Sequence, residues 1–102
     1  MSTNNARNIS QEEFDRRSAE VRATPEYQAA YRAAQIAYEL GTQVRVAREK
    51  RGWTQTELAA RAGMRQHAIS RFEAGDSVPT IQTLERIAAA LDVQLTIELA
   101  SA

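Results

Sequence analysis

Hydrophobic and polar residues alternate with two different periods along this chain, and the change of period divides it. From residue 54 to residue 91, apolar side chains recur every three or four positions, the spacing at which a helix buries one face. From residue 93 to residue 99 apolar and polar residues strictly alternate, which is typical of a half-buried β-strand. The alternating apolar residues are Val93, Leu95, Ile97 and Leu99. The pattern therefore predicts a mainly α-helical protein that ends in one strand.

Capping signals set the ends of the expected helices. Thr54 and Glu57 have the spacing of a capping box, in which two side chains satisfy the first free amides of a helix. Ser10 and Glu13 repeat that spacing near the start of the chain. Helices are therefore expected over about 10–22, 25–51, 54–62, 65–74 and 80–91, after a frayed tail at 1–9. Gly41 falls inside the second helix, where we expect a kink or a boundary.

The two short helices predicted between residues 54 and 75 carry the main functional signal. Gly63 is expected to form the turn between them, because glycine readily adopts the left-handed conformation that ends a helix. The second helix turns Ile69 and Phe72 inward and long polar side chains outward. Those polar residues are Gln66, His67 and Arg71. A helix with one apolar face and one hydrogen-bonding face suits the major groove of DNA.

Many residues in the second half of the chain agree in register with one known pattern. They are Arg48, Gly52-Trp53-Thr54-Gln55, Glu57-Leu58-Ala59, Ala62-Gly63, Ile69-Ser70-Arg71-Phe72-Glu73, Gly75, Pro79 and the segment from Leu84 to Leu91. With these residues, the stretch from about 40 to 95 resembles the Xre or lambda-repressor-like helix-turn-helix family. The resemblance implies a small helical bundle at 40–92 that binds double-stranded operator DNA. The residues expected to face its core are Leu58, Ala59, Ala62, Ile69 and Phe72, with Val44 and Leu84 as neighbours.

The same resemblance implies roles for individual residues. Gln66, His67 and Arg71 would read base edges, since glutamine can pair with adenine and arginine with guanine through two hydrogen bonds each. Four residues would contact DNA phosphates, and they are Thr54, Gln55, Arg65 and Ser70. Arg48 and Glu73 would form a partly buried, structural ion pair between the first helix of the domain and the end of the recognition helix at 65–74.

Arg65 departs from the family's pattern at the start of the recognition helix. The family usually has serine or threonine there as the capping residue, and arginine is a poor cap that costs about 1 kcal/mol. Two explanations are open. Either the helix starts at another residue, or Arg65 is present because it binds phosphate.

Residues 1–39 form an extension that a minimal repressor of this type does not need. Its layout, a short charged helix followed by an Ala- and Tyr-rich helix, looks like that of HigA-type antitoxins of toxin–antitoxin modules. The likeness implies a toxin partner of the RelE/HigB type, a ribosome-dependent mRNA endonuclease that this protein would neutralise while repressing the shared operon. The residues expected to contact the toxin are Phe14, Tyr27, Tyr31 and Tyr38.

Two alternatives to toxin binding follow from the same residues. The three tyrosines share one helical stripe, and such a stripe can pack on the helix-turn-helix domain instead of a partner protein. The chain is then a stand-alone transcriptional regulator of the Xre family whose N-terminal helices only pack or dimerise. The gene beside this one would distinguish the two hypotheses, because an antitoxin is encoded next to its toxin.

The predicted strand at 93–99 has no second strand in the sequence with which to pair. Its backbone donors and acceptors need a partner edge, which the same segment of a second copy would supply. A homodimer also suits the charge, which is zero overall, with seven basic and four acidic side chains between residues 41 and 78. A monomer this weakly basic would bind DNA poorly, because phosphate contacts supply most non-specific affinity. We therefore assign residues 93–102 to dimerisation.

The composition argues against several other classes of protein. The chain has no cysteine and one histidine, which argues against a metal site. It has no catalytic triad and no glycine-rich phosphate loop, so we expect neither an enzyme nor a cofactor. No apolar run approaches the roughly 20 residues of a membrane span, and the polar N-terminus is unlike a secretory signal. The lack of cysteine also fits a cytoplasmic protein.

Overall fold

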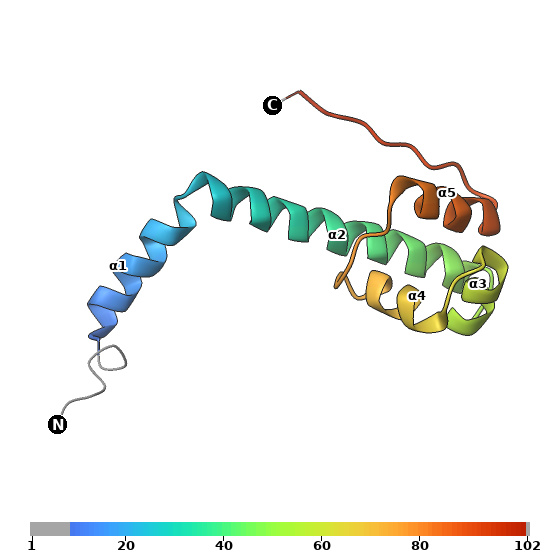
Figure 1. The fold of residues 1–102 in the computed structure, drawn as a ribbon, viewed down its shortest axis with the longest axis horizontal. Helices are drawn as coiled ribbons and strands as arrows, with labels where there is room; N and C mark the ends of the chain where they lie inside the picture. The colour runs from blue at the N-terminus through green and yellow to red at the C-terminus, as the bar shows by residue number, and fades with distance from the viewer. Residues whose placement is uncertain (1–8, 102) are drawn as a thin grey trace. The chain divides into compact units, whose positions relative to one another are not determined.

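The computed structural model describes residues 9–101 and holds five helices within that range (Figure 1). They are α1 at Gln11–Arg22, α2 at Pro25–Lys50, α3 at Gln55–Ala62, α4 at Gln66–Glu73 and α5 at Ile81–Ala90. The mainly helical prediction is confirmed, with boundaries within about two residues of the expected ones. The expected tail at 1–9 lies almost wholly outside the described residues. The chain divides into two compact units, Met1–Ala33 and Ala34–Ala102.

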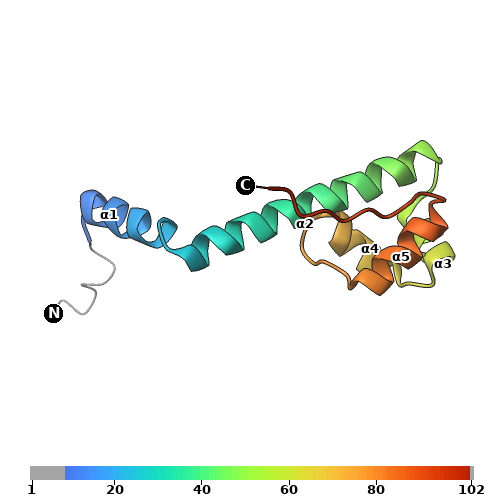
Figure 2. The ribbon, with the colours of Figure 1, turned by 90° about the horizontal axis from the view of Figure 1, so that it is seen from above.

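The second unit contains a hydrophobic core built by α3, α4 and α5. These three helices gather beside the C-terminal half of α2 in both ribbon views (Figures 1 and 2). The core cluster consists of Leu58, Ala59, Ala62, Ile69, Phe72, Leu84, Ile87 and Leu91. From α2, Leu40, Val44 and Ala47 pack against it. The inward-facing residues expected from the periodicity are thus confirmed, and they hold α3 and α4 in a fixed arrangement.

Gly41 does not end or divide α2, so the expected boundary is wrong. The helix continues through it from Pro25 to Lys50. A side chain at this position would collide with the backbone carbonyl oxygen of Phe72, and a β-carbon would lie 3.0 Å from the carbonyl oxygen of Glu73. The glycine is therefore required by the close approach of α4 to α2. Periodicity within one helix carries no sign of such a contact.

The ends of the short helices follow the capping signals in the sequence. The Thr54 hydroxyl accepts a hydrogen bond from the Glu57 amide at 3.1 Å, and the Glu57 carboxylate accepts one from the Thr54 amide at 3.1 Å. Both halves of this capping box are present. Gly63 ends α3 with φ of 66°, a conformation that suits glycine. At α1 only one half forms, because Ser10 caps the Glu13 amide while the Glu13 carboxylate pairs with Arg17.

The strand expected at 93–99 is absent from the described residues, so that prediction is wrong for a single chain. The segment after α5 has no regular secondary structure and runs as an extended trace (Figure 1). Leu95 packs on the core, whereas Val93, Ile97 and Leu99 are 51%, 60% and 97% exposed. A strand forms only when its backbone pairs with a neighbour, and one chain offers this segment none.

The first unit is built from α1 and the start of α2. None of its described residues, 9–33, is buried. Phe14, Val21 and Tyr27 line a shallow hollow of about 410 Å³. The rings of Tyr27 and Tyr31 stack with centroids 6.4 Å apart. Within the described part of the chain, no helix has the length and apolar character needed to cross a membrane.

Candidate nucleic-acid interface

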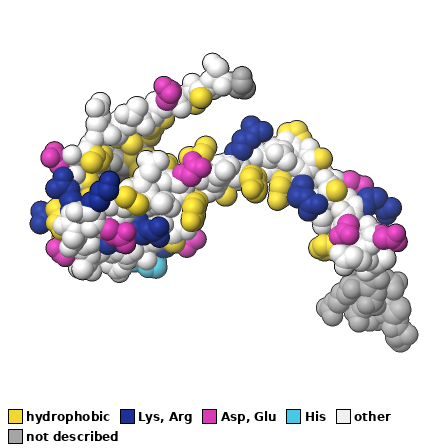
Figure 3. Space-filling model, turned by 180° about the vertical axis from the view of Figure 1, so that it is seen from behind, with side chains coloured by type: hydrophobic (Ala, Val, Ile, Leu, Met, Phe, Trp, Pro, Cys, Tyr) yellow, Lys and Arg dark blue, Asp and Glu magenta, His cyan; other side chains and the backbone are white. Residues whose placement is uncertain are grey.

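Helix α4 has one buried face and one exposed polar face. Ile69 and Phe72 are fully buried, and both point into the core. The three residues expected to read bases, Gln66, His67 and Arg71, are exposed on the same helix. Basic side chains lie on the surface of this unit, interspersed with acidic ones (Figure 3). The helix therefore has the two-faced character that insertion into a groove requires.

The four residues expected at phosphates lie near the start of α3 and on α4. Thr54 and Arg65 are exposed, and Gln55 and Ser70 are half-buried. Arg65 occupies the capping position of α4, and its side chain makes no capping hydrogen bond. The recognition helix thus starts at Gln66 and not elsewhere, which removes one of the two explanations for Arg65. A helix start without a side-chain cap leaves amide donors for another partner.

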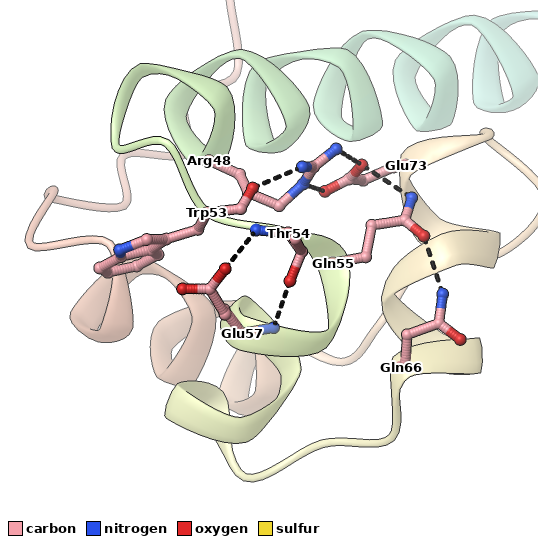
Figure 4. A network of polar contacts seen from close by, with 7 residues as sticks. All are labelled: Arg48, Trp53, Thr54, Gln55, Glu57, Gln66 and Glu73. Atoms are coloured by element: carbon pink, nitrogen blue, oxygen red, sulfur yellow. Dashed lines mark hydrogen bonds and ion pairs between the residues drawn. The ribbon is translucent and has the colours of Figure 1, made fainter.

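Arg48 and Glu73 form an ion pair with two parallel hydrogen bonds (Figure 4). Arg48 Nε donates to Glu73 Oε2 at 2.8 Å, and Arg48 Nη2 donates to Glu73 Oε1 at 2.9 Å. Their side chains are only 11% and 3% exposed. The hydrogen bonds to Glu73 raise the pKa of the Arg48 guanidinium, against the opposite effect of its burial. A third bond, from Arg48 Nη1 to the Trp53 carbonyl oxygen at 2.8 Å, also fixes the start of α3.

Two glutamines extend this ion pair to the surface of α4. Gln55 Nε2 donates to Glu73 Oε1 at 3.1 Å, and Gln66 Nε2 donates to Gln55 Oε1 at 2.8 Å. Figure 4 shows Gln66 at the outer end of this series. The structure therefore links a residue expected at a phosphate, Gln55, with one expected at a base. The sequence placed both near the DNA but contained no signal for the contact between them.

Two further arginine contacts near α3 were missed at the level of sequence. Arg86 on α5 donates to the carbonyl oxygens of Ala62 and Gly63, where α3 ends. A cation there complements the negative end of the helix dipole and fixes the turn between α3 and α4. The guanidinium of Arg61 lies 4.1 Å from the centre of the Trp53 ring, which makes a cation–π contact. The Arg86 contact joins α5 to the end of α3, and the Arg61 contact joins the last turn of α3 to the residue before its cap. Neither contact has a local sequence signature.

A family model described as helix-turn-helix, HTH_3, matches residues 44–97, which is more than half of the chain. The chain belongs to the HTH_3 helix-turn-helix family. The matched segment contains α3 and α4 with their turn, the buried ion pair and the exposed face of α4. The matched segment therefore lies within the second unit of the structure, and α1 lies outside the match.

Relatives of this HTH_3 protein include antitoxins and transcriptional regulators. It is 34% identical over 59 residues to antitoxin HipB of Escherichia coli strain K12, which covers 58% of this chain and 67% of HipB. It is 40% identical over 55 residues to an uncharacterised regulator, y4dL, of Sinorhizobium fredii, covering 54% of this chain and 28% of that protein. These relatives make the chain a DNA-binding regulator related to antitoxins, and not an enzyme.

Solved structures give the same assignment. An HTH_3 family transcriptional regulator from Vibrio cholerae matches with a TM-score of 0.59 and 27% identity, covering 61% of this chain and 35% of that one. This chain thus spans about a third of that regulator's length. HipB in a HipA–HipB–O2–O3 complex matches with a TM-score of 0.55 and 31% identity, covering 64% of this chain and 92% of that one. The antitoxin relatives are HipB, so the finer likeness to HigA-type antitoxins rests on residues 1–39 alone.

Among the described residues, no group of three or more potential metal ligands of the His, Cys, Asp and Glu types comes together. Every buried side-chain nitrogen and oxygen in that range has a hydrogen-bond partner. The polar groups of the HTH_3 domain are therefore committed to internal contacts or exposed on its surface.

Proposed function

We propose that this HTH_3 protein is an autorepressing antitoxin that binds operator DNA through α4 and a toxin through its N-terminal extension, residues 1–39. The observation that carries the proposal is the exposed face of α4, held on a buried core, in a chain 34% identical to antitoxin HipB. DNA recognition and toxin binding are assigned to different residues, and Phe14, Tyr27 and Tyr31 lie in the first unit while Tyr38 lies in the second. A substitution should therefore be able to remove one of these activities and leave the other.

In the proposed complex, α4 lies in the major groove. Gln66 and Arg71 make paired hydrogen bonds to base edges, and His67 contacts a neighbouring base. The backbone contacts are assigned to Thr54, Gln55, Arg65 and Ser70. The exposure of Arg65 and its lack of a capping bond support a phosphate contact. Phosphate contacts position the helix, and base contacts supply the sequence preference.

The protein is proposed to bind as a homodimer joined through residues 93–99. Ile97 and Leu99 leave large apolar surfaces in water, and the segment's backbone has no ladder partner within its own chain. Pairing with the same segment of a second copy would bury these apolar surfaces and supply partners for the backbone hydrogen-bonding groups. Figure 3 shows apolar side chains along this segment. A dimer reads two half-sites about 34 Å apart, so the operator would be pseudo-palindromic.

Proline in place of Ile97 tests the dimer, because proline removes a ladder hydrogen bond. The change lies outside the core, so the helices should fold normally by circular dichroism. Light scattering should show a monomer where the parent protein is a dimer, with weaker operator binding. A variant that keeps the parent's mass in solution would show that this segment is not the interface.

The toxin site is proposed on the aromatic residues Phe14, Tyr27, Tyr31 and Tyr38. Phe14, Tyr31 and Tyr38 are 54%, 59% and 61% exposed, and tyrosine is enriched at protein interfaces. The layout of residues 1–39 favours a RelE/HigB-type endonuclease as the partner. The HipA–HipB complex among the relatives makes a HipA-like protein the other candidate. The relation to regulators such as y4dL favours a second function, a stand-alone regulator without a toxin.

Co-expression with the protein encoded beside this one tests the proposal. If that neighbour is a toxin, the full-length antitoxin should restore growth. A variant with Phe14, Tyr27 and Tyr31 changed to alanine should lose the rescue but still bind operator DNA. Arg71→Ala should lose operator binding but still restore growth. Rescue by the triple variant would remove the toxin site from these residues, and a neighbour without toxicity would favour the stand-alone regulator.

A further inference from the structure

A directional series of hydrogen bonds leads from the buried ion pair to the exposed start of α4 (Figure 4). It begins at Arg48, passes through Glu73 and Gln55, and ends at Gln66. The order is also one of burial, since Glu73 is 5% exposed, Gln55 is half-buried and Gln66 is exposed. The inner members are therefore held by the core, and the outer member is held by them.

The chemistry of the inner members fixes the direction of each amide. An ionised carboxylate only accepts hydrogen bonds, so Gln55 must turn its Nε2 group toward Glu73. The opposite orientation would place two acceptor oxygens against each other in a site largely closed to water. The Gln55 oxygen is then directed at Gln66, which must turn its own Nε2 toward it. One negative charge at Glu73 thus determines how an exposed side chain is oriented.

The orientation of Gln66 decides which base it complements. As held, Gln66 has its oxygen and one amide hydrogen left for the DNA. An acceptor beside a donor matches adenine, which offers the N6 donor and the N7 acceptor in the major groove. If the amide were reversed, both hydrogens would be free, and two donors match the N7 and O6 acceptors of guanine. The two orientations therefore predict different bases at the same position.

We propose that Glu73 is a positioning residue that sets the base preference of Gln66, through Gln55, in favour of adenine over guanine. The inference rests on the proposed function, in which α4 reads the major groove. It assigns to Glu73 a part in DNA specificity, in addition to its ion pair with Arg48. It concerns the ratio of two affinities, which a purely structural role would leave unchanged.

The test starts from the full-length protein and a library of randomised DNA duplexes. Selection gives the preferred operator, and Gln66→Ala identifies the base pair that residue 66 reads as the one whose preference is lost. Two duplexes are then made that differ only at this pair, one with adenine and one with guanine. Fluorescence anisotropy measures the affinity of each variant for both.

The parent protein should prefer adenine by about tenfold or more, the discrimination typical of a paired contact. Glu73→Gln should reduce this ratio to about threefold or less, because the neutral amide accepts either orientation of Gln55. Gln55→Ala should reduce it equally while leaving the Arg48–Glu73 pair in place, which covers the event that Glu73→Gln folds poorly. Combining Gln55→Glu with Glu73→Gln should restore the preference, because a carboxylate again faces Gln66 Nε2.

Unchanged adenine-to-guanine ratios in Glu73→Gln or Gln55→Ala, with or without a uniform loss of affinity, would overturn the inference. So would a Gln66→Ala variant that keeps every preference of the parent, or a parent that prefers guanine at this pair. A parent protein that selects no sequence from the library would instead contradict the proposed function. The two failures are therefore distinguishable.

Discussion

The two units of this chain differ in what they bury. In the HTH_3 unit, Phe72, Leu58, Ile69, Ile87 and Leu91 are fully buried. In the first unit, none of the described residues from 9 to 33 is buried, and Phe14 and Val21 are more than half exposed. Apolar burial is the main term that offsets the entropy lost when a chain becomes ordered. The HTH_3 unit is therefore stabilised by its own core, whereas the described part of the first unit has only helix propensity and local contacts to stabilise it.

One ion pair in each unit makes this comparison sharp. Arg48 and Glu73 approach to 2.8 Å, and Arg17 and Glu13 approach to 2.9 Å. The side chains of the first pair are 11% and 3% exposed, and those of the second are 58% and 34% exposed. The shortest distances are similar, but the buried pair is joined by two hydrogen bonds and the exposed pair by one. Burial and the paired hydrogen bonds should both make the first pair more stabilising than the second. The predictions below use this contrast.

Glu73→Ala is expected to have the largest effect. It leaves the Arg48 guanidinium in a closed site with the Trp53 carbonyl as its one remaining described partner, and it also removes the acceptor of Gln55. Loss of one member of a buried pair costs about 3–5 kcal/mol. Thermal or urea unfolding monitored by circular dichroism measures the loss. Glu85→Ala, on the exposed surface of α5, is the matched control and should change little. A melting temperature within one or two degrees of the parent's would show that the pair is not structural.

Gly41→Ala is expected to have an intermediate effect. Alanine favours a helix over glycine by about 0.5–1 kcal/mol, so this change would stabilise α2 if the position were open. Here the added methyl group collides with the carbonyl oxygen of Phe72, which belongs to a helix backbone and has little freedom to move. We expect a net loss of about 1–3 kcal/mol. Gln43→Ala, exposed on the same helix, is the control in the unfolding experiment. A more stable Gly41→Ala protein would contradict the close packing of α2 on α4.

The sequence predicted best those features that depend on neighbouring residues. The capping box of Thr54 and Glu57, the turn at Gly63 and the inward face of α4 are local, so their patterns were sufficient. Gly41 was misread because the reason for its small size lies on another helix, at Phe72. The strand at 93–99 was misread because a strand requires a second backbone, and the alternation of apolar residues does not supply one.

The sequence indicated which residue types could contact DNA, but not how their side chains contact one another. The residue types that suit base and phosphate contacts stand out on α4 and at the start of α3. The link from Glu73 through Gln55 to Gln66 depends on side chains from three positions that are 7 to 18 residues apart, and their orientation follows from packing. Arg86 at the end of α3 is a similar case, since its contact with Gly63 spans 23 residues.

Glu13→Ala is expected to have the smallest effect, and it completes the comparison of the two ion pairs. The Glu13 carboxylate accepts a hydrogen bond from Arg17 one helical turn away, where water surrounds both groups. Such exposed pairs contribute about 0.3–0.5 kcal/mol, because solvent screens the charges and holding two long side chains costs entropy. The unfolding midpoint should therefore move by a small fraction of the Glu73→Ala shift, and 0.5 M salt should remove most of the difference. Gln11→Ala, which breaks an uncharged contact on the same helix, is the control. A loss comparable to that of Glu73→Ala would mean that the first unit buries these charges in solution, and that its exposed surface is covered by another molecule.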